Sequence, residues 1–194
     1  GGSVLDALAA RTPRHGEEMA DFILRQVART SAFWFITTVI AIRVIIISAV
    51  SVHFIAIMVW TGMSEQRAAY FLAAQAALAL PSHLFFGWLG DKVSKPKLMA
   101  SCMVLATSSM VLLGTVHSEW AILLFAALFN TVESTFPVNW STVGDYFGRK
   151  NFAKIRGSMS FVSTWGSVLG PVAAGALYDS SKSYEVLIWS SAAL

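Results

Sequence analysis

The hydrophobic positions of the chain fall into long runs that are separated by short polar stretches. A helix needs about 20 apolar residues to cross the hydrocarbon core of a bilayer, and its backbone groups must be paired within the segment. The runs far exceed the roughly ten alternating residues of a membrane barrel strand. The pattern therefore predicts an all-α membrane protein. Its predicted helices cover residues 33–60, 68–89, 98–116, 120–143, 152–177 and the start of another at 184–194.

The two ends of the chain depart from this pattern. Residues 1–32 are polar and form a predicted cytoplasmic segment that precedes a transmembrane bundle over residues 33–194. Within that segment, residues 18–29 place apolar side chains near one face, which indicates a short amphipathic helix on the membrane surface; an extended linker is the alternative. The last apolar run, 184–194, is too short to cross the hydrocarbon, so we expect a truncated helix.

The composition narrows the class of protein. The chain is 56% hydrophobic and only 13% charged, whereas a soluble domain averages about 25% charged residues. The single cysteine, Cys102, lies inside an apolar run and excludes a disulfide framework and a cysteine zinc cluster. The sequence contains no nucleophile elbow, phosphate loop or metalloprotease motif. We therefore expect no enzyme, no cofactor, no metal site and no nucleic-acid partner.

The basic residues of the loops alternate from one side of the predicted membrane to the other. One set of loops holds nine of them and the other set holds only Arg67 and Lys182. An excess of Lys and Arg is typical of cytoplasmic loops. We therefore expect a multi-pass protein of the cell membrane, such as a bacterial inner membrane, with the N-terminal segment and the loops at 91–97 and 145–156 in the cytoplasm.

Those two loops resemble each other. The first reads GDKVSKPK from Gly90 to Lys97, and the second reads GDYFGRK from Gly144 to Lys150. In both, a Gly-Asp pair ends a predicted helix, a small residue follows three positions after the Asp, and basic residues come next. A helical hairpin separates the two loops, as an internally repeated membrane fold requires.

The motif of the first loop is Gly87-x-x-x-Asp91-Lys92-x-Ser94-Lys95. It resembles the signature loop of the major facilitator superfamily, Gly-x-x-x-Asp-Arg-x-Gly-Arg-Arg, and departs from it at Lys for Arg, Ser for Gly, and a proline at the last basic place. The resemblance covers residues 22–194. It implies the C-terminal six-helix bundle of a twelve-helix carrier, with the last helix truncated and the segments corresponding to helices seven to twelve.

Later in the chain, a glycine-rich run resembles helix eleven of the bacterial monocarboxylate and oxalate:formate antiporter-like branch of that superfamily. Its residues, which we expect to serve helix packing, are Gly166, Gly170, Pro171 and Gly175. Oxalate carriers hold their dianion with an arginine in helix eight and a lysine in helix eleven. This sequence has neither charge there, which argues against oxalate itself.

The resemblance also implies a function and partners. We expect a secondary active transporter that moves a small solute, such as an organic anion, by alternating access with proton coupling or exchange. Its expected partners are membrane lipid, the N-terminal half of the carrier and the small-molecule substrate. A transport-inactive sensor or interaction protein on the same scaffold is the alternative. The family's signature loop gates the path, which implies gating roles for Gly87, Asp91, Lys92, Lys95, Asp145 and Arg149.

Two charges of opposite sign lie in the middle of predicted membrane helices, where each needs a partner or a wet cavity. Arg43 is either a site for an anionic substrate or a structural, snorkelling residue. Glu133 shares one face of an otherwise apolar helix with Asn130, Pro137 and Trp140, which suggests a cavity lining and a group that titrates during transport. The alternative is a carboxylate that Arg43 or the other half neutralises permanently.

The remaining polar residues of the membrane segments give weaker signals. His53 is a candidate proton group, although a histidine at the outer interface is the simpler interpretation. His83 follows Pro81 closely, and we expect it to bond at a kink. Gln75 and Ser82 are seven residues apart, so they share a face of their helix and are expected to border the cavity.

Overall fold

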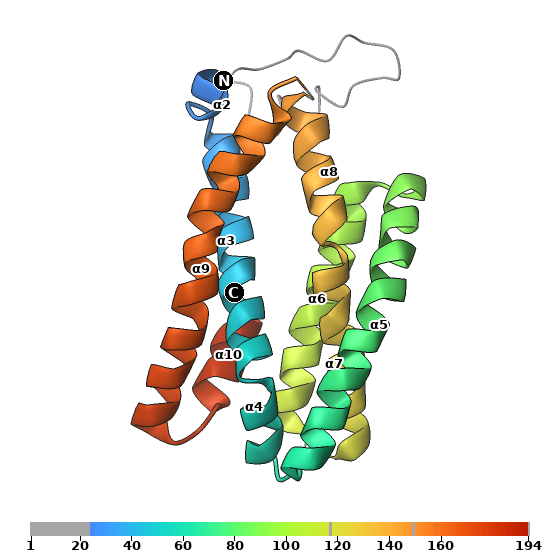
Figure 1. Cartoon of the computed structure of the whole chain (residues 1–194), viewed down its shortest axis with the longest axis vertical. Helices are drawn as coiled ribbons and strands as arrows, with labels where there is room; N and C mark the ends of the chain where they lie inside the picture. Colours follow the sequence, from blue (N-terminus) through green and yellow to red (C-terminus); the bar gives the residue numbers. More distant parts are fainter. Residues whose placement is uncertain (1–23, 117, 149, 194) are drawn as a thin grey trace.

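The computed structural model of the chain describes residues 24–116, 118–148 and 150–193. Its long helices lie side by side along the longest axis of the molecule (Figure 1), and the described residues contain no strand. The predicted all-α class is confirmed. The helices are α2 (Leu24–Val27), α3 (Ser31–Val52), α4 (Phe54–Trp60), α5 (Glu65–Lys92), α6 (Lys95–Thr115), α7 (Glu119–Ser134), α8 (Phe136–Phe147), α9 (Phe152–Ser181) and α10 (Glu185–Ala193).

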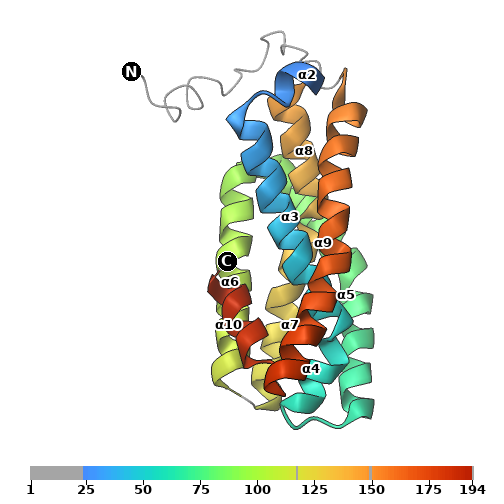
Figure 2. The ribbon, with the colours of Figure 1, turned by 90° about the vertical axis from the view of Figure 1, so that its left-hand side faces the viewer.

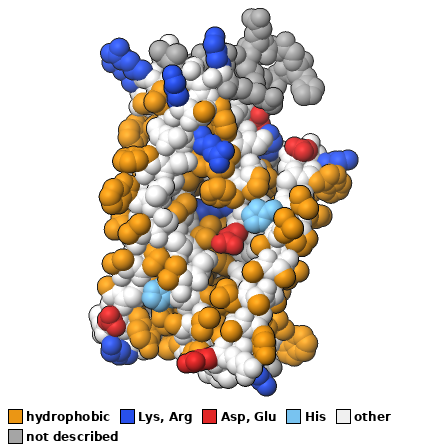
Figure 3. Space-filling model, in the orientation of Figure 1, with side chains coloured by type: hydrophobic (Ala, Val, Ile, Leu, Met, Phe, Trp, Pro, Cys, Tyr) orange, Lys and Arg blue, Asp and Glu red, His pale blue; other side chains and the backbone are white. Residues whose placement is uncertain are grey.

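Five stretches of the described chain are long and apolar enough to cross a membrane. They are Ser31–Val52, Glu65–Lys92, Lys95–Thr115, Trp120–Phe147 and Phe152–Ser181. Large apolar side chains cover the flanks of the molecule, and charged side chains gather toward its two ends (Figure 3). Phe35 is 72% exposed and Leu80 is 70% exposed. Apolar surface of this extent is suited to lipid rather than to water.

Only part of the predicted amphipathic helix falls among the described residues. Positions 18–23 lie outside them, and α2 covers the four residues that follow. Val27 is buried against α3, α8 and α9 in an apolar cluster. The indole Nε1 of Trp34 donates to the carbonyl of Ala28 at 2.9 Å, which fixes the turn between α2 and α3.

Two of the predicted helices are interrupted. The first breaks at His53, between α3 and α4, and the fourth breaks at Thr135, between α7 and α8. The cause of the second break is visible in the sequence, because Pro137 has no N–H to donate to the carbonyl of Glu133. The backbone N–H of Thr135 donates to that carbonyl instead. The remaining boundaries lie within a few residues of the predicted ones.

The helices α3 and α9 pack together along most of their length, and they lie side by side in both views (Figures 1 and 2). Glycines on α9 make this approach possible. A Cβ at Gly170 would lie 2.4 Å from the carbonyl oxygen of Ile45, and one at Gly166 would lie 3.0 Å from that of Ala41. Gly175 differs, since its nearest neighbour is the ring of His53 at 3.8 Å.

The buried apolar side chains form two main clusters at different heights of the bundle. One gathers around Phe54, Phe125 and Ile188, close to the connections α4–α5 and α9–α10. The other gathers around Phe33 and Ile155, close to α2. On each of these helices, the residues of the two clusters are separated by a stretch that belongs to neither. These stretches are the middle portions of α3 and α9 and the break between α7 and α8. The buried polar residues of the candidate site come from this middle level.

Candidate functional site

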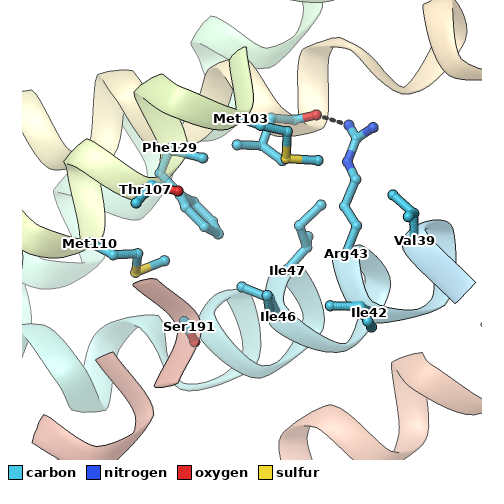
Figure 4. Close-up of a pocket in the computed structure, with 12 residues that line it drawn as sticks. Val39, Ile42, Arg43, Ile46, Ile47, Met103, Thr107, Met110, Phe129 and Ser191 are labelled. Carbon is cyan, nitrogen blue, oxygen red and sulfur yellow. Dashed lines mark hydrogen bonds between the residues drawn. The ribbon is translucent and has the colours of Figure 1, made fainter. Parts of the chain in front are cut away.

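Arg43 extends from the middle of α3 to the break between α7 and α8. Its side chain is buried, and Nη2 donates to the backbone carbonyl of Val132 (Figure 4). The same nitrogen donates to the hydroxyl Oγ1 of Thr135 at 2.9 Å. The Nε atom is buried and has no hydrogen-bond partner among the described residues. The guanidinium is therefore held by the end of a neighbouring helix.

In sequence, Glu133 lies between Val132 and Thr135, the two residues that Arg43 contacts. Both of these are buried, whereas the Glu133 side chain is only half-buried. The hydroxyl of Ser51, on α3, donates to its Oε1 at 3.5 Å, a long hydrogen bond. Among the described residues, no ion pair joins Glu133 to Arg43 or to another cation. The described acidic residues other than Glu133 lie at or near helix ends. Glu133 is thus the carboxylate placed in the interior of a membrane-length stretch.

Asn130 connects α7 to α5. Its Nδ2 donates to the hydroxyl of Ser82 at 3.2 Å, while its Oδ1 is buried without a described partner. Gln75, two turns before Ser82 on α5, also has a buried and unpartnered carbonyl oxygen. His83 bonds to the carbonyl of Ala79 at 2.6 Å, within its own helix. Pro81 leaves the carbonyl of Ala77 without its helical donor, so the bond of His83 to Ala79 does not itself test the expected bond at a kink.

The four residues expected on one face of the fourth helix do not share one environment, and the break at Thr135 separates Asn130 and Glu133 from Pro137 and Trp140. Asn130 contacts α5, and Glu133 contacts α3. Trp140 is buried in the cluster near α2, with its Nε1 unpartnered and the guanidinium of Arg156 at 5.0 Å from its ring. Pro137 borders a different cavity, near the signature-like loop.

That cavity, of about 230 Å³, lies between α5, α6 and α8 and includes Asp91, Lys95 and Ser141. Asp91 is exposed and makes no ion pair within the described part of the chain. Lys95 instead reaches the second loop, with Nζ at 2.6 Å from both Asp145 Oδ2 and Ser141 Oγ. The structure thereby joins the two repeated loops directly.

Three other residues of the expected gating set have separate positions. A Cβ at Gly87 would meet nothing within 4 Å, so this glycine leaves open space beside the cavity. Lys92 lies with Nζ at 5.2 Å from the ring of Trp88. Arg149 falls outside the described residues.

His53 occupies the break between α3 and α4. Its Nε2 lies 3.1 Å from the carbonyl of Pro171, on α9, and its Nδ1 lies 3.0 Å from the hydroxyl of Tyr184. Nε2–H donates to the Pro171 carbonyl, while Nδ1 can either accept from or donate to the Tyr184 hydroxyl. Tyr184 is buried and stacks on Tyr178, with ring centroids 4.6 Å apart. Burial raises the pKa of the Tyr184 hydroxyl, and the nearby Tyr178 and Asp179 raise it further.

A second cavity, of about 220 Å³, lies on the other side of Arg43, between α3, α6, α7 and α10 (Figure 4). Its walls are mostly apolar, and Thr107 and Ser191 are the polar residues that line it besides Arg43. No group of three or more His, Cys, Asp or Glu side chains among the described residues is arranged to hold a metal ion.

Several contributors to the site carry no signal in the sequence. Thr135 and Ser51 are hydroxyl residues in apolar runs, where most such side chains bond their own helix. Tyr184 precedes a helix and gives no indication that it contacts His53. Only Pro137, two residues after Thr135, indicates in the sequence the helix break at which Thr135 bonds to Arg43.

The comparisons with known proteins agree with this architecture. A comparison with curated proteins finds no significant match. The family model described as Major Facilitator Superfamily matches residues 30–194, which include the membrane-length helices and the site. The chain therefore belongs to the Major Facilitator Superfamily, a superfamily of multi-pass membrane transporters.

Proposed function

We propose that the chain supplies one wall of the path of a secondary active transporter, in which Glu133 couples solute movement to protons. The small solute moves by alternating access between this bundle and a second half of the carrier. The observation that carries the proposal is the half-buried Glu133 carboxylate, located inside a membrane-length stretch without an ion-pair partner among the described residues.

The chemistry of this carboxylate suits a coupling group. An ionised group inside a bilayer is expensive unless it is paired or reaches water, so it is seldom present without a function. The one hydrogen bond between the Glu133 side chain and the described part of the chain is the long one from Ser51. A weakly held carboxylate can accept a proton when the path is open to one side and release it when the path is open to the other.

The solute is a small molecule, and an organic anion is one candidate. Asn130, Gln75 and Trp140 each carry a buried polar atom without a described partner, so a changed conformation could turn these atoms toward a solute. We propose that they line or support the path. His53 already has partners on both ring nitrogens, which favours a supporting role.

We further propose that the end of the bundle with α2 and the repeated loops faces the cytoplasm. Lysine and arginine side chains concentrate there, whereas Arg67 and Lys182 lie at the opposite end. In this orientation Asp91 is free to meet a helix start of the second half and gate the path, while Lys95 and Asp145 hold α6 to α8. An impermeant thiol reagent should label Ser94→Cys only from the cytoplasmic side, in a Cys102→Ser background; labelling from outside intact cells would refute the orientation.

The substitution Glu133→Gln tests the coupling role in the full-length carrier. The neutral amide resembles a permanently protonated acid, so proton-driven accumulation should be lost. Exchange of labelled for unlabelled solute should persist, because it needs no net proton movement. If the variant accumulated solute with the pH dependence of the wild type, Glu133 would not be the coupling group.

A further inference from the structure

The end of α7 leaves backbone carbonyls that need donors from outside the helix. The last four carbonyls of any helix lack partners within it, and Pro137 prevents the chain from continuing the pattern. The carbonyl of Val132 accepts from the Thr135 hydroxyl at 2.8 Å and also from Arg43 Nη2. Arg43 therefore serves as a C-terminal cap for α7, although it belongs to a different helix.

This contact leaves little surface exposed, although Arg43 and Val132 also line the apolar cavity between α3, α6, α7 and α10. Arg43 is 6% exposed, Val132 is 4% exposed and Thr135 is 2% exposed. The three groups also form a closed triangle, because the threonine hydroxyl accepts from the guanidinium and donates to the carbonyl. A positive charge at the carbonyl end of a helix is electrostatically favourable. The cation is thus partly neutralised by the helix end, while its buried Nε has no hydrogen-bond partner among the described residues.

Glu133 gains its position from the same segment. It lies between Val132 and Thr135 in sequence, and its flanking residues are sealed while its own side chain is half-buried. The cap fixes the backbone on both sides of the glutamate. It therefore fixes the direction in which the carboxylate leaves the helix, toward Ser51 on α3.

We infer that Arg43 is a positioning residue, which caps the break between α7 and α8 so that Glu133 faces the transport path, and that it does not itself contact the solute. The inference rests on the proposed coupling role of Glu133 and replaces a direct anion-binding role for Arg43. The titratable groups that interact electrostatically with the guanidinium are Glu133, on α7, and Cys102, on α6.

The test uses the full-length carrier and two variants that weaken the cap from opposite sides. Thr135→Val removes the bridging hydroxyl but keeps the shape of the side chain and the charge of Arg43. Arg43→Gln removes the charge. Thr135→Ser, which keeps the hydroxyl, and Cys102→Ser, which removes the other titratable group, serve as controls.

Both cap variants should shift the pH profile of transport in the same direction, and Arg43→Gln should lower proton-driven accumulation about tenfold, as expected for loss of a charge-assisted bond. Thr135→Val should lower it about fivefold, as expected for a neutral hydrogen bond of about 1 kcal/mol. The two control variants should have the pH profile and the proton-driven accumulation of the wild type. The KM for solute exchange in a Glu133→Gln background should be unchanged by Arg43→Gln.

Two results would overturn the inference. One is a wild-type pH profile for Thr135→Val, which can be read even if Arg43→Gln fails to fold. The other is a raised exchange KM for Arg43→Gln in the Glu133→Gln background, which would place the guanidinium on the solute. Failure of the coupling proposal itself gives a different result, namely wild-type pH dependence in Glu133→Gln alone.

Discussion

The two interrupted helices of the bundle are built in similar ways but use different chemistry. At both breaks, a side chain connects the interruption to another helix. At Thr135 the connection is made by a cation, Arg43, which donates to a helix end. At His53 it is made by an imidazole ring, which bonds to the Pro171 carbonyl and the Tyr184 hydroxyl.

The difference shows which break is suited to coupling. If His53 gained a proton, Nδ1–H could donate to the Tyr184 oxygen, and both contacts would survive. The protonation of His53 therefore has little effect on the geometry of its break. The Thr135 break carries a weakly held carboxylate, Glu133, next in sequence to the residues that hold the buried Arg43, so a proton on Glu133 changes the net charge of that segment. We expect the first break to support the structure and the second to serve transport.

The largest expected effect on stability comes from the helix that supports the His53 break. Gly170→Ala would place a Cβ against the backbone of α3, and overpacking of this kind costs about 1–3 kcal/mol. Gly175→Ala is the matched control, since its Cβ would meet only ordinary contact distances. Thermal unfolding of the detergent-purified carrier should show a clear loss for the first variant and almost none for the second. Equal losses would contradict the packing role of Gly170.

Replacing Pro137 should remove the Thr135 break and leave the His53 break intact, so that the function of the Thr135 break can be measured separately. Pro137→Ala supplies the N–H that a continuous helix would donate to the Glu133 carbonyl in place of Thr135; Pro137 stands in the first turn of α8, where proline costs a helix little. The variant should keep or gain thermal stability, yet transport should fall because Glu133 and its cap are displaced. Transport assays and thermal unfolding on the same preparation would check this. Unchanged transport would show that the break is dispensable.

The smallest expected effect follows from Tyr184→Phe, which removes one partner of His53. The loss of a hydrogen bond costs about 1 kcal/mol, and the pH profile of transport should stay that of the wild type. A shifted pH profile of transport would show that His53 takes part in proton coupling.

The same variant has a signature at high pH. Burial raises the pKa of Tyr184 in the folded protein, so the unfolded state loses this proton first and binds fewer protons. Stability should then fall as the pH rises above about 10, the ordinary value for tyrosine. Tyr184→Phe should reduce that fall, as thermal unfolding across the alkaline range would show.

Most of the fold could be predicted from the sequence, because a membrane-length apolar run has few structural alternatives. The break at His53 could not, since no proline or glycine marks it and its stabilising contacts come from residues more than a hundred positions away. The sequence identified Arg43 and Glu133 as unusual, because charges in apolar runs are rare. Their partners remained hidden, since a backbone carbonyl such as that of Val132 is present at every position and gains meaning only from packing.

The most direct test of the account is the change in bound protons when solute binds to the purified full-length carrier in weakly buffered solution. The account predicts that wild-type carrier takes up or releases protons in proportion to the amount of protein, and that Glu133→Gln does neither while still binding solute. Thr135→Val should show a proton change that is reduced or displaced in pH. Proton exchange of wild-type size in Glu133→Gln would contradict the central claim that this carboxylate is the coupling group.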